Sequence, residues 1–390
     1  MKAAIGTKAA VIGAGFIGPV HVEGLRRAGV VVKGVLGIDR NESETAARNM
    51  GLDRAYLSLD EILKDKEVAS VHIASPNKLH ASMALAALEA GKHVVCEKPL
   101  AMTSKESGAL VAASKKRPNQ VAAVNYNLRF YPLNIEARTR IRRGDCGEVF
   151  HIRGAYVQDW LLYPNDFNWR VLAEEGGATR AVGDVGTHWL DLVHYITGLE
   201  AESVLADLRV VHPVRHRPLG QVETYKDKEK GAAEKMERKP VKIETEDYGA
   251  VLIKFKGGAR ASLLVSQVTA GRKNRLEYEI SCAKAAVAWV SESPNEMWIG
   301  SRESANQVLM RDPSLLAPEA RKFANYPGGH NEGFPDTFKQ VYRAIYEDIR
   351  GGGPKPSSLY ATFVDGHREL VLCEAILESS RKQAWVKIKS

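Results

Sequence analysis

Residues 8–127 alternate short runs of β-branched residues with amphipathic stretches, and this alternation constrains the fold more than any other feature. Five runs have the composition of strands: KAAVIG, VVVKGVLGID, VASVHIAS, HVVCEK and QVAAVNYN. The intervening stretches have helical periodicity. Two of them begin with the capping-box pairs Ser58/Glu61 and Thr103/Glu106, and several end in glycine. Because apolar strands that alternate with helices indicate a parallel sheet covered on both faces, we predict a doubly wound α/β domain over residues 1–128.

The pattern changes after residue 128, where helices become sparse and the strand candidates are longer and alternate in polarity. One helix candidate, LNIEARTRIRRG, precedes six strand-like runs, and the C-terminal part of the chain returns to helical periodicity. This pattern predicts an α+β domain over residues 129–390, with a mainly antiparallel sheet that packs one face on helices. Residues 215–240 are polar and rich in Pro, Lys and Glu, and we expect a mobile excursion between strands there.

Composition and charge exclude several classes of protein. The chain has 390 residues, 44% hydrophobic and 26% charged, as in an ordinary globular protein of roughly two domains. The net charge of +8 is spread along the chain without a basic block interleaved with aromatic residues, which disfavours nucleic acid and suits anionic cofactors or substrates. Four separated cysteines, the lack of a signal sequence and the lack of a long apolar run predict a cytoplasmic protein that is neither exported nor membrane-spanning.

The motif Gly13-Ala-Gly15-Phe-Ile-Gly18 follows the first strand candidate and opens the next helix. In this context the first glycine permits the tight turn, the second lets the backbone approach a pyrophosphate, and the third lets helix pack on strand. Asp39 ends the second strand candidate, where a carboxylate would bind the adenosine ribose hydroxyls and repel a 2′-phosphate. We therefore predict NAD as the cofactor. Arg40 leaves the use of NADP open, and a glycine turn without a cofactor is the simpler alternative.

The tripeptide Glu97-Lys98-Pro99 ends an apolar strand candidate, HVVCEKPL. Proline fixes its own φ and restricts the residue before it, so a lysine held at the mouth of a parallel sheet is placed for chemistry. A strand-ending lysine on a solvated edge is the simpler interpretation. The glycine turn upstream and an Asp-x-x-x-His pair downstream favour the functional one.

Asp184, His188 and Asp191 are spaced i, i+4 and i+7 at the start of an apolar helix that ends at Gly198, so we expect their side chains to share one face. The opposite face carries Leu190, Val193 and Ile196 and is the expected core face. A polar stripe at a helix start is also compatible with capping and a solvated surface. Without a further cluster at ligand spacing, we expect no metal site.

These elements together resemble the Gfo/Idh/MocA oxidoreductase family, which includes glucose–fructose oxidoreductase and inositol dehydrogenases. The resemblance spans nearly the whole chain: the glycine turn, SPNKLH, EKP, NYNLRF, the D-x-G-x-H-x-x-D helix and a closing helix that begins DGHREL. It implies that Lys98, Asp184 and His188 form the catalytic set, with the nicotinamide beside Glu97 and Lys98. It also implies a cis bond before Pro99, and dimers or tetramers formed through the open sheet of the second domain.

The site residues expected from the motifs and the resemblance form two sets. The cofactor-binding set is Gly13, Gly15, Phe16, Ile17, Gly18, Asp39, Arg40, Ser75, Pro76, Asn77, His80, Glu97, Lys98, Asn125 and Arg170. The substrate-binding set is Lys98, Tyr126, Arg129, Trp160, Asp166, Trp169, Asp184, His188 and His330. Several members lie in the loop WLLYPNDFNWR, whose aromatic faces and short polar groups suit polyhydroxylated rings. Packing of that loop on its own domain, and an ordinary turn role for His330, are the simpler alternatives.

These residue types fit the oxidation of a secondary alcohol. His188 is the natural base for the hydroxyl proton because imidazole titrates close to working pH. Asp184 would orient the imidazole, and the Lys98 ammonium would stabilise negative charge on the reacting oxygen. The leading hypothesis is an NAD-dependent dehydrogenase of a sugar, sugar derivative or cyclitol. A glycosidase that recycles its NAD, and a non-catalytic sensor, are the alternatives, and net NADH release would separate the first two.

Overall fold

The computed structural model describes residues 7–219 and 237–389, and their contacts divide the chain into two compact units. The first unit contains the described parts of Met1–Asn127 together with Pro335–Leu370. The second contains Leu128–Phe334 and the described part of Val371–Ser390. The segment Pro335–Leu370, which we placed in the second domain from the sequence, therefore makes its contacts within the first unit.

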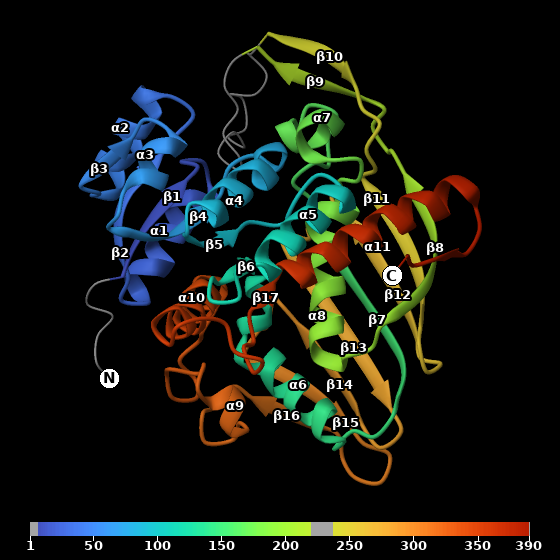
Figure 1. Ribbon diagram of the computed structural model, residues 1–390. Helices are drawn as coiled ribbons and strands as arrows, with labels where there is room; N and C mark the ends of the chain where they lie inside the picture. The colour runs from blue at the N-terminus through green and yellow to red at the C-terminus, as the bar shows by residue number, and fades with distance from the viewer. Residues whose placement is uncertain (1–6, 220–236, 390) are drawn as a thin grey trace. The chain divides into compact units, whose positions relative to one another are not determined.

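A seven-stranded sheet forms the centre of the first unit, in the order β17-β6-β5-β4-β1-β2-β3 (Figure 1). Its strands are β1 (Lys8–Ile12), β2 (Val31–Leu36), β3 (Arg54–Tyr56), β4 (Val68–Ile73), β5 (His93–Cys96), β6 (Ala122–Val124) and β17 (Ala361–Thr362). Every pairing is parallel except that of β17 with β6. The predicted parallel sheet is confirmed, and the short strands β3 and β17 are additions to it. Consecutive residues of β5, such as Val94 and Val95, are fully buried, as in a strand that is covered on both faces.

Helices connect these strands. They are α1 (Ile17–Arg27), α2 (Arg40–Met50), α3 (Leu59–Lys64), α4 (His80–Glu89), α5 (Ser104–Lys115) and α10 (Phe334–Arg350), with short 3₁₀ turns at Asn77–Leu79 and Asn127–Phe130. The capping box predicted at Thr103 and Glu106 is complete. At Ser58 only half of the predicted box forms, because the Glu61 carboxylate accepts the amide of Leu57 instead of that of Ser58.

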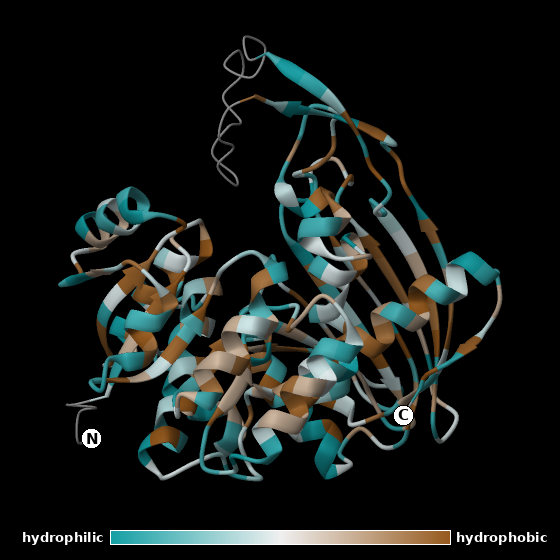
Figure 2. Cartoon of the chain, turned by 45° about the horizontal axis from the view of Figure 1, so that its top comes forward, coloured by the Kyte–Doolittle hydropathy of each residue, from teal (hydrophilic) through white to brown (hydrophobic). Residues whose placement is uncertain are grey.

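The second unit is built on a nine-stranded sheet, in the order β16-β15-β14-β13-β7-β12-β11-β8-β18. Its strands are β7 (Val149–Val157), β8 (Ala201–Arg209), β11 (Tyr248–Phe255), β12 (Arg260–Ser266), β13 (Arg275–Cys282), β14 (Ala286–Val290), β15 (Glu296–Gly300), β16 (Gln307–Met310) and β18 (Val386–Lys387). All neighbours are antiparallel except β7 and β12, which confirms the mainly antiparallel sheet. Figure 2 shows hydrophobic residues concentrated in the strands.

Helices pack on one face of this sheet: α6 (Pro132–Arg143), α8 (Thr187–Thr197) and the C-terminal part of α11 (Phe363–Lys382). On that face, β11 buries Val251 and Ile253, each of which contributes about 1.5–3 kcal/mol by burial. Gly154 of β7 lies under α8, because a Cβ there would stand 2.2 Å from Nε1 of Trp189. On the opposite face Leu252 is exposed, so the strand alternates as a sheet covered on one side must.

The helix that carries His188 differs from the expectation in two ways. A π-helical turn, Val182–Gly186, precedes α8, so Asp184 lies outside the regular α-helical register. Every residue of α8 is buried, and Asp191 forms an ion pair with Arg129 instead of continuing a polar stripe. The expected division into a polar face and a core face is therefore wrong, because partners cover this helix all round.

The remaining elements are short. They are α7 (Ala173–Gly176), α9 (Pro318–Arg321), a 3₁₀ turn at Trp169–Val171, and the two-stranded ribbon of β9 (Val214–Pro218) and β10 (Arg238–Lys242). The ribbon occupies the ends of the segment 215–240, for which we expected a mobile excursion; residues 220–236 of that segment lie outside the described residues. Among the described helices, none is long and apolar enough to cross a lipid bilayer.

Candidate active site

Four predicted cofactor segments of the first unit meet at one edge of the parallel sheet, where β1, β4, β5 and β6 end. The amide of Ala74 donates to the carbonyl of Ile12 over 2.7 Å, and the amide of Glu97 donates to that of Ile73 over 2.8 Å. The amide of Asn125 extends the row by donating to Cys96 over 2.8 Å. Strands β1 and β4 are neighbours at the point where the strand order reverses, which is where open α/β sheets bind ligands.

The glycine turn has the shape that a pyrophosphate requires. Gly13 has φ of +107°, and a Cβ there would stand 2.4 Å from the carbonyl oxygen of Ala74. A Cβ on Gly18 would stand 2.1 Å from the carbonyl oxygen of Gly13. At Gly15, by contrast, no atom lies within 4 Å of the Cβ position, so the backbone is open to a ligand. Phe16 and Ile17 continue from this turn into α1. The turn therefore fits a dinucleotide.

Asp39 lies at the N-cap of α2, where Oδ1 accepts the amide of Glu42 over 2.8 Å. This capping role occupies one carboxylate oxygen of an exposed side chain. Arg40 forms an i, i+4 ion pair with Glu44 at 3.4 Å. Ile38, beside Asp39, is an apolar residue that is 86% exposed.

His80 connects the loop after β4 to the turn after β5. Its Nδ1 lies 2.7 Å from the carbonyl oxygen of Pro99, and its Nε2 lies 2.9 Å from that of Ser75. Burial lowers the pKa of His80, although both carbonyl contacts act in the opposite direction. The imidazole therefore links the backbone of the loop after β4 to the backbone of the turn after β5. Pro76 is half-buried beside Ser75, and Asn77 is buried at the start of the following 3₁₀ turn.

The bond between Lys98 and Pro99 is cis, which confirms the expectation from the resemblance. Glu97 is buried, with 8% of the residue exposed, and its Oε1 accepts from Nε2 of His21 at 3.0 Å and from Nδ2 of Asn125 at 2.5 Å. Burial would raise the pKa of Glu97, but these hydrogen bonds and the nearby charges of His21 and Lys98 outweigh it and lower the pKa to about 2. The side chain of Lys98 is half-buried next to an ionised carboxylate.

A buried polar network extends from Glu97 into the first unit. The Nδ1 atom of His21 lies 3.0 Å from Nδ1 of His72 and 2.8 Å from the hydroxyl of Tyr342. Nε2 of His72 contacts the hydroxyl of Tyr346 at 3.0 Å. Burial, followed by the adjacent His21, lowers the pKa of His72 well below its usual value. Sequence reasoning missed this network, since its members lie on α1, β4 and α10.

In the second unit, Asp184 lies in the π-helical turn and His188 lies at the start of α8. Oδ2 of Asp184 accepts from Nε2 of Gln267 at 2.8 Å, and Oδ1 lies 3.7 Å from Nε of Arg170. The guanidinium of Arg170 is centred 4.4 Å above the ring of Trp169. His188 is 8% exposed, and its ring centroid lies 6.0 Å from that of Tyr156.

Three expected substrate residues have structural partners. Nε of Arg129 donates to Asp191 over 2.7 Å, and its guanidinium is centred 4.8 Å from the ring of Tyr195. Tyr126 is 1% exposed within the core of the first unit. Trp160 is 6% exposed and packs in a small apolar cluster with Leu161, Val171 and Ile243. Contacts of these three residues with a substrate stay predictions.

Two further expected residues stabilise turns. Oδ2 of Asp166 accepts the amide of Tyr163 over 2.8 Å, within the aromatic loop. His330 is exposed in a turn, with Nδ1 3.4 Å from the carbonyl oxygen of Gly328. The contact of His330 is compatible with an ordinary turn role, and contacts of both residues with a substrate stay predictions.

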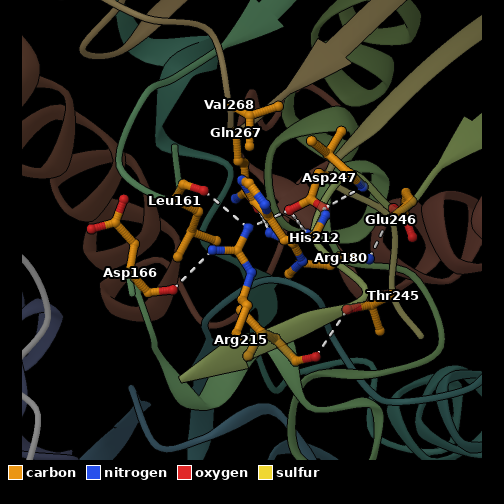
Figure 3. A network of polar contacts seen from close by, with 12 residues as sticks. Leu161, Asp166, Arg180, His212, Arg215, Thr245, Glu246, Asp247, Gln267 and Val268 are labelled. Carbon is orange, nitrogen blue, oxygen red and sulfur yellow. Dashed lines mark hydrogen bonds and ion pairs between the residues drawn. The ribbon is translucent and has the colours of Figure 1, made fainter. Parts of the chain in front are cut away.

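Figure 3 shows a buried charged cluster in the second unit, centred on Asp247. Asp247 accepts from the guanidinium groups of Arg180 and Arg215, and all three side chains are fully buried. Burial would raise the pKa of Asp247, but the two arginines lower it. The amides of Arg180 and Val182 both donate to Oε1 of Glu246 over 2.9 Å. The cluster therefore fixes the backbone that leads into the π-helical turn.

The chain matches two models of one protein family. Residues 7–126 match the oxidoreductase family with the NAD-binding Rossmann fold, and residues 135–288 match the GFO/IDH/MocA C-terminal domain. Lys98 lies in the first matched segment, and Asp184 and His188 lie in the second. The chain belongs to the Gfo/Idh/MocA family, and it is an oxidoreductase with an NAD-binding Rossmann domain.

Two curated relatives are sugar or cyclitol dehydrogenases. Levoglucosan dehydrogenase of Pseudarthrobacter phenanthrenivorans is 31% identical over 350 residues, which cover 88% of this chain and 86% of that protein. The scyllo-inositol 2-dehydrogenase (NAD(+)) of Bacillus subtilis is 28% identical over 231 residues, 58% of this chain and 65% of that protein. A solved levoglucosan dehydrogenase in complex with NADH and levoglucosan has a TM-score of 0.86 and 28% identity, covering 98% of this chain and 99% of that one.

Proposed function

We propose that this protein is an NAD-dependent dehydrogenase that oxidises a secondary hydroxyl of a sugar, sugar derivative or cyclitol. The observation that carries the proposal is the position of Lys98 at the carboxyl edge of the parallel sheet, next to the buried Glu97 and in the same unit as the glycine turn. The similarity to sugar and inositol dehydrogenases supports the class of substrate.

Lys98, Asp184 and His188 form the proposed catalytic set. Bound NAD would supply the hydride acceptor, and the glycine turn with Asp39 would hold it. The imidazole of His188 accepts the hydroxyl proton, and Asp184 orients that imidazole or a neighbouring hydroxyl. The ammonium of Lys98 donates to the reacting oxygen and stabilises the negative charge that develops there. Trp169 is a proposed contact for the substrate ring, and Arg170, which stacks on it, is a proposed contact for the cofactor.

The open face of the nine-stranded sheet is the proposed surface for homo-oligomers. It exposes Leu252 and Leu264, which are 47% and 37% exposed on the neighbouring strands β11 and β12. A hollow of about 330 Å³ on the same sheet is lined by both basic and acidic residues, including Arg275 and Glu277. A surface with both signs of charge can pair with a second copy of itself. The four cysteines, all free thiols, support a cytoplasmic location.

A screen of sugars, inositols and glycosides, with NADH fluorescence as the readout, tests this function. We expect stoichiometric NADH release with at least one free sugar or cyclitol. Cleavage of a glycoside without net NADH would instead indicate a glycosidase that recycles its cofactor. Tight sugar binding without turnover in either direction would contradict both enzymes and indicate a sensor.

A further inference from the structure

Gln267 connects the proposed active-site carboxylate to the buried charged cluster. It follows β12 directly and is fully buried (Figure 3). Its Nε2 donates to Oδ2 of Asp184 over 2.8 Å, and its Oε1 accepts from Nη1 of Arg180 at 3.0 Å. Its backbone is fixed as well, because its amide donates to the carbonyl of Asp247 over 3.0 Å and its carbonyl accepts from Leu161.

The orientation of this side-chain amide follows from the chemistry of its neighbours. A guanidinium carries only donors, so the amide oxygen of Gln267 must face Arg180. The NH₂ group then faces Asp184, whose ionised carboxylate carries only acceptors. No other orientation satisfies both partners, so Gln267 presents a fixed donor to Asp184.

The cluster behind Gln267 is itself immobilised. Nη2 of Arg215 donates to Asp247 over 2.6 Å, and Nη1 donates to the carbonyls of Tyr163 and Asp166 over 2.9 Å each. Oδ2 of Asp247 accepts the amide of Val211 at 2.7 Å. Buried groups with this many charge-assisted bonds move together. The same cluster therefore holds both Gln267 and the loop that leads to Trp169 and Arg170.

We propose that Gln267 is a positioning residue. It holds the carboxylate of Asp184 in place, because its own side chain is held by Arg180 of the Arg180–Asp247–Arg215 cluster. This proposal rests on the proposed function, in which Asp184 acts at the reacting hydroxyl. Asp184 then has a carboxylate with one oxygen held by an amide and the other oxygen near Arg170. Its geometry is fixed before the substrate binds, as electrostatic preorganisation requires.

Two substitutions of Gln267 separate positioning from a structural role. In Gln267→Leu the donor to Asp184 is lost, and we expect kcat/KM to fall roughly 10- to 100-fold at every pH, as for a hydrogen bond to a charged group. Gln267→Glu keeps a partner for Arg180 but places a second carboxylate against Asp184. A proton shared by the two carboxylates would restore a donor to Asp184, so the loss should be smallest at acid pH and should grow as the pH rises and that proton is released. Gln158→Glu is the matched control, because Gln158 is a buried glutamine of the same unit that donates to Asn274.

A double-mutant cycle with Asp184→Asn completes the test, with NAD affinity and thermal unfolding measured for every variant. We expect Gln267→Leu to cost much less in the Asp184→Asn background than in the wild type. Additive losses, or an unchanged pH profile in Gln267→Glu, would overturn the positioning proposal while leaving the proposed function intact. If Asp184→Asn alone retains full kcat/KM, the proposed role of Asp184 fails first. Should Gln267→Leu not fold, Gln267→Glu and its pH profile decide the question.

Discussion

Lys98 and Glu97 are neighbours of opposite charge, and their surroundings give them different roles. The Glu97 carboxylate is buried and accepts from His21 and Asn125, whereas Lys98 is only half-buried. Glu97 has its own donors in His21 and Asn125, and the charge of Lys98 beside it lowers its pKa further. The Lys98 ammonium is the group that we propose to stabilise negative charge on the reacting oxygen.

Replacement of Lys98 by alanine should therefore affect the chemical step. We expect Lys98→Ala to retain NAD binding but to lose more than tenfold in kcat, more than about 1.4 kcal/mol of transition-state stabilisation. Steady-state kinetics and NAD titration measure the two effects. Lys105→Ala, at an exposed lysine of α5, is the control. A kcat within tenfold of the wild type would leave Lys98 a strand-end residue without a catalytic role.

Glu97 makes stability depend on acid pH. Its folded-state pKa of about 2 is below its usual value, so its ionised form contributes stability above about pH 4.5, and that contribution is lost as the pH falls towards 2. We expect the contribution of Glu97 to the free energy of unfolding to fall by on the order of 1 kcal/mol between pH 6 and pH 4. Denaturant unfolding at both pH values measures it. The pH dependence should become shallower by that amount in Glu97→Gln, and an equal slope in both proteins would contradict the assignment.

At the scale of elements, the glycines at the junction of β1 and α1 have two different functions: Gly18 permits close packing of the backbone, and Gly15 leaves space for the cofactor. Gly18→Ala should destabilise the protein by about 1–3 kcal/mol, because its Cβ would overlap the Gly13 carbonyl. Gly15→Ala should leave the free energy of unfolding within about 0.5 kcal/mol of the wild type but weaken NAD binding, because its Cβ enters the open space. Denaturant unfolding and NAD titration test the pair. The prediction fails if Gly15→Ala unfolds more easily while its affinity for NAD is unchanged.

The sequence predicted those elements whose signal is local. The β-branched runs located β1, β2, β4, β5 and β6, and the glycine motif located α1. The short strands β17 and β3 were not predicted, because neither contains a run of β-branched residues. The π-helical turn was not predicted, because its residues have the pattern of an ordinary α-helix start.

The site residues follow the same division. Motifs identified Lys98, Asp184 and His188, whereas the partners that set their environment lie far away in the sequence. Gln267 is 83 residues from Asp184, and Tyr342 is 321 residues from His21. No spacing rule connects such pairs. Arg129 is a further example, since its buried partner Asp191 lies 62 residues away and the sequence did not predict this ion pair.

At the scale of the whole molecule, we predict that copies of the chain associate through the open face of the nine-stranded sheet. We expect the double substitution Leu252→Glu with Leu264→Glu to dissociate the oligomer, because it places like charges at the centre of a self-paired surface. Sedimentation equilibrium of the wild type and the variant measures the change. Leu315→Glu, at a 56% exposed loop position, is the control. A wild type that remains monomeric at all concentrations would contradict the proposed interface.

The return of Pro335–Leu370 to the first unit determines when this unit can be completed during translation. The strand β17 and the tyrosines of α10 leave the ribosome only after most of the second unit has been synthesised. Until then, β6 remains an uncovered sheet edge, and His21 and His72 lack the hydroxyl groups of Tyr342 and Tyr346. Until this segment has been synthesised, the N-terminal part of the nascent chain therefore has an open sheet edge, the kind of feature that favours aggregation.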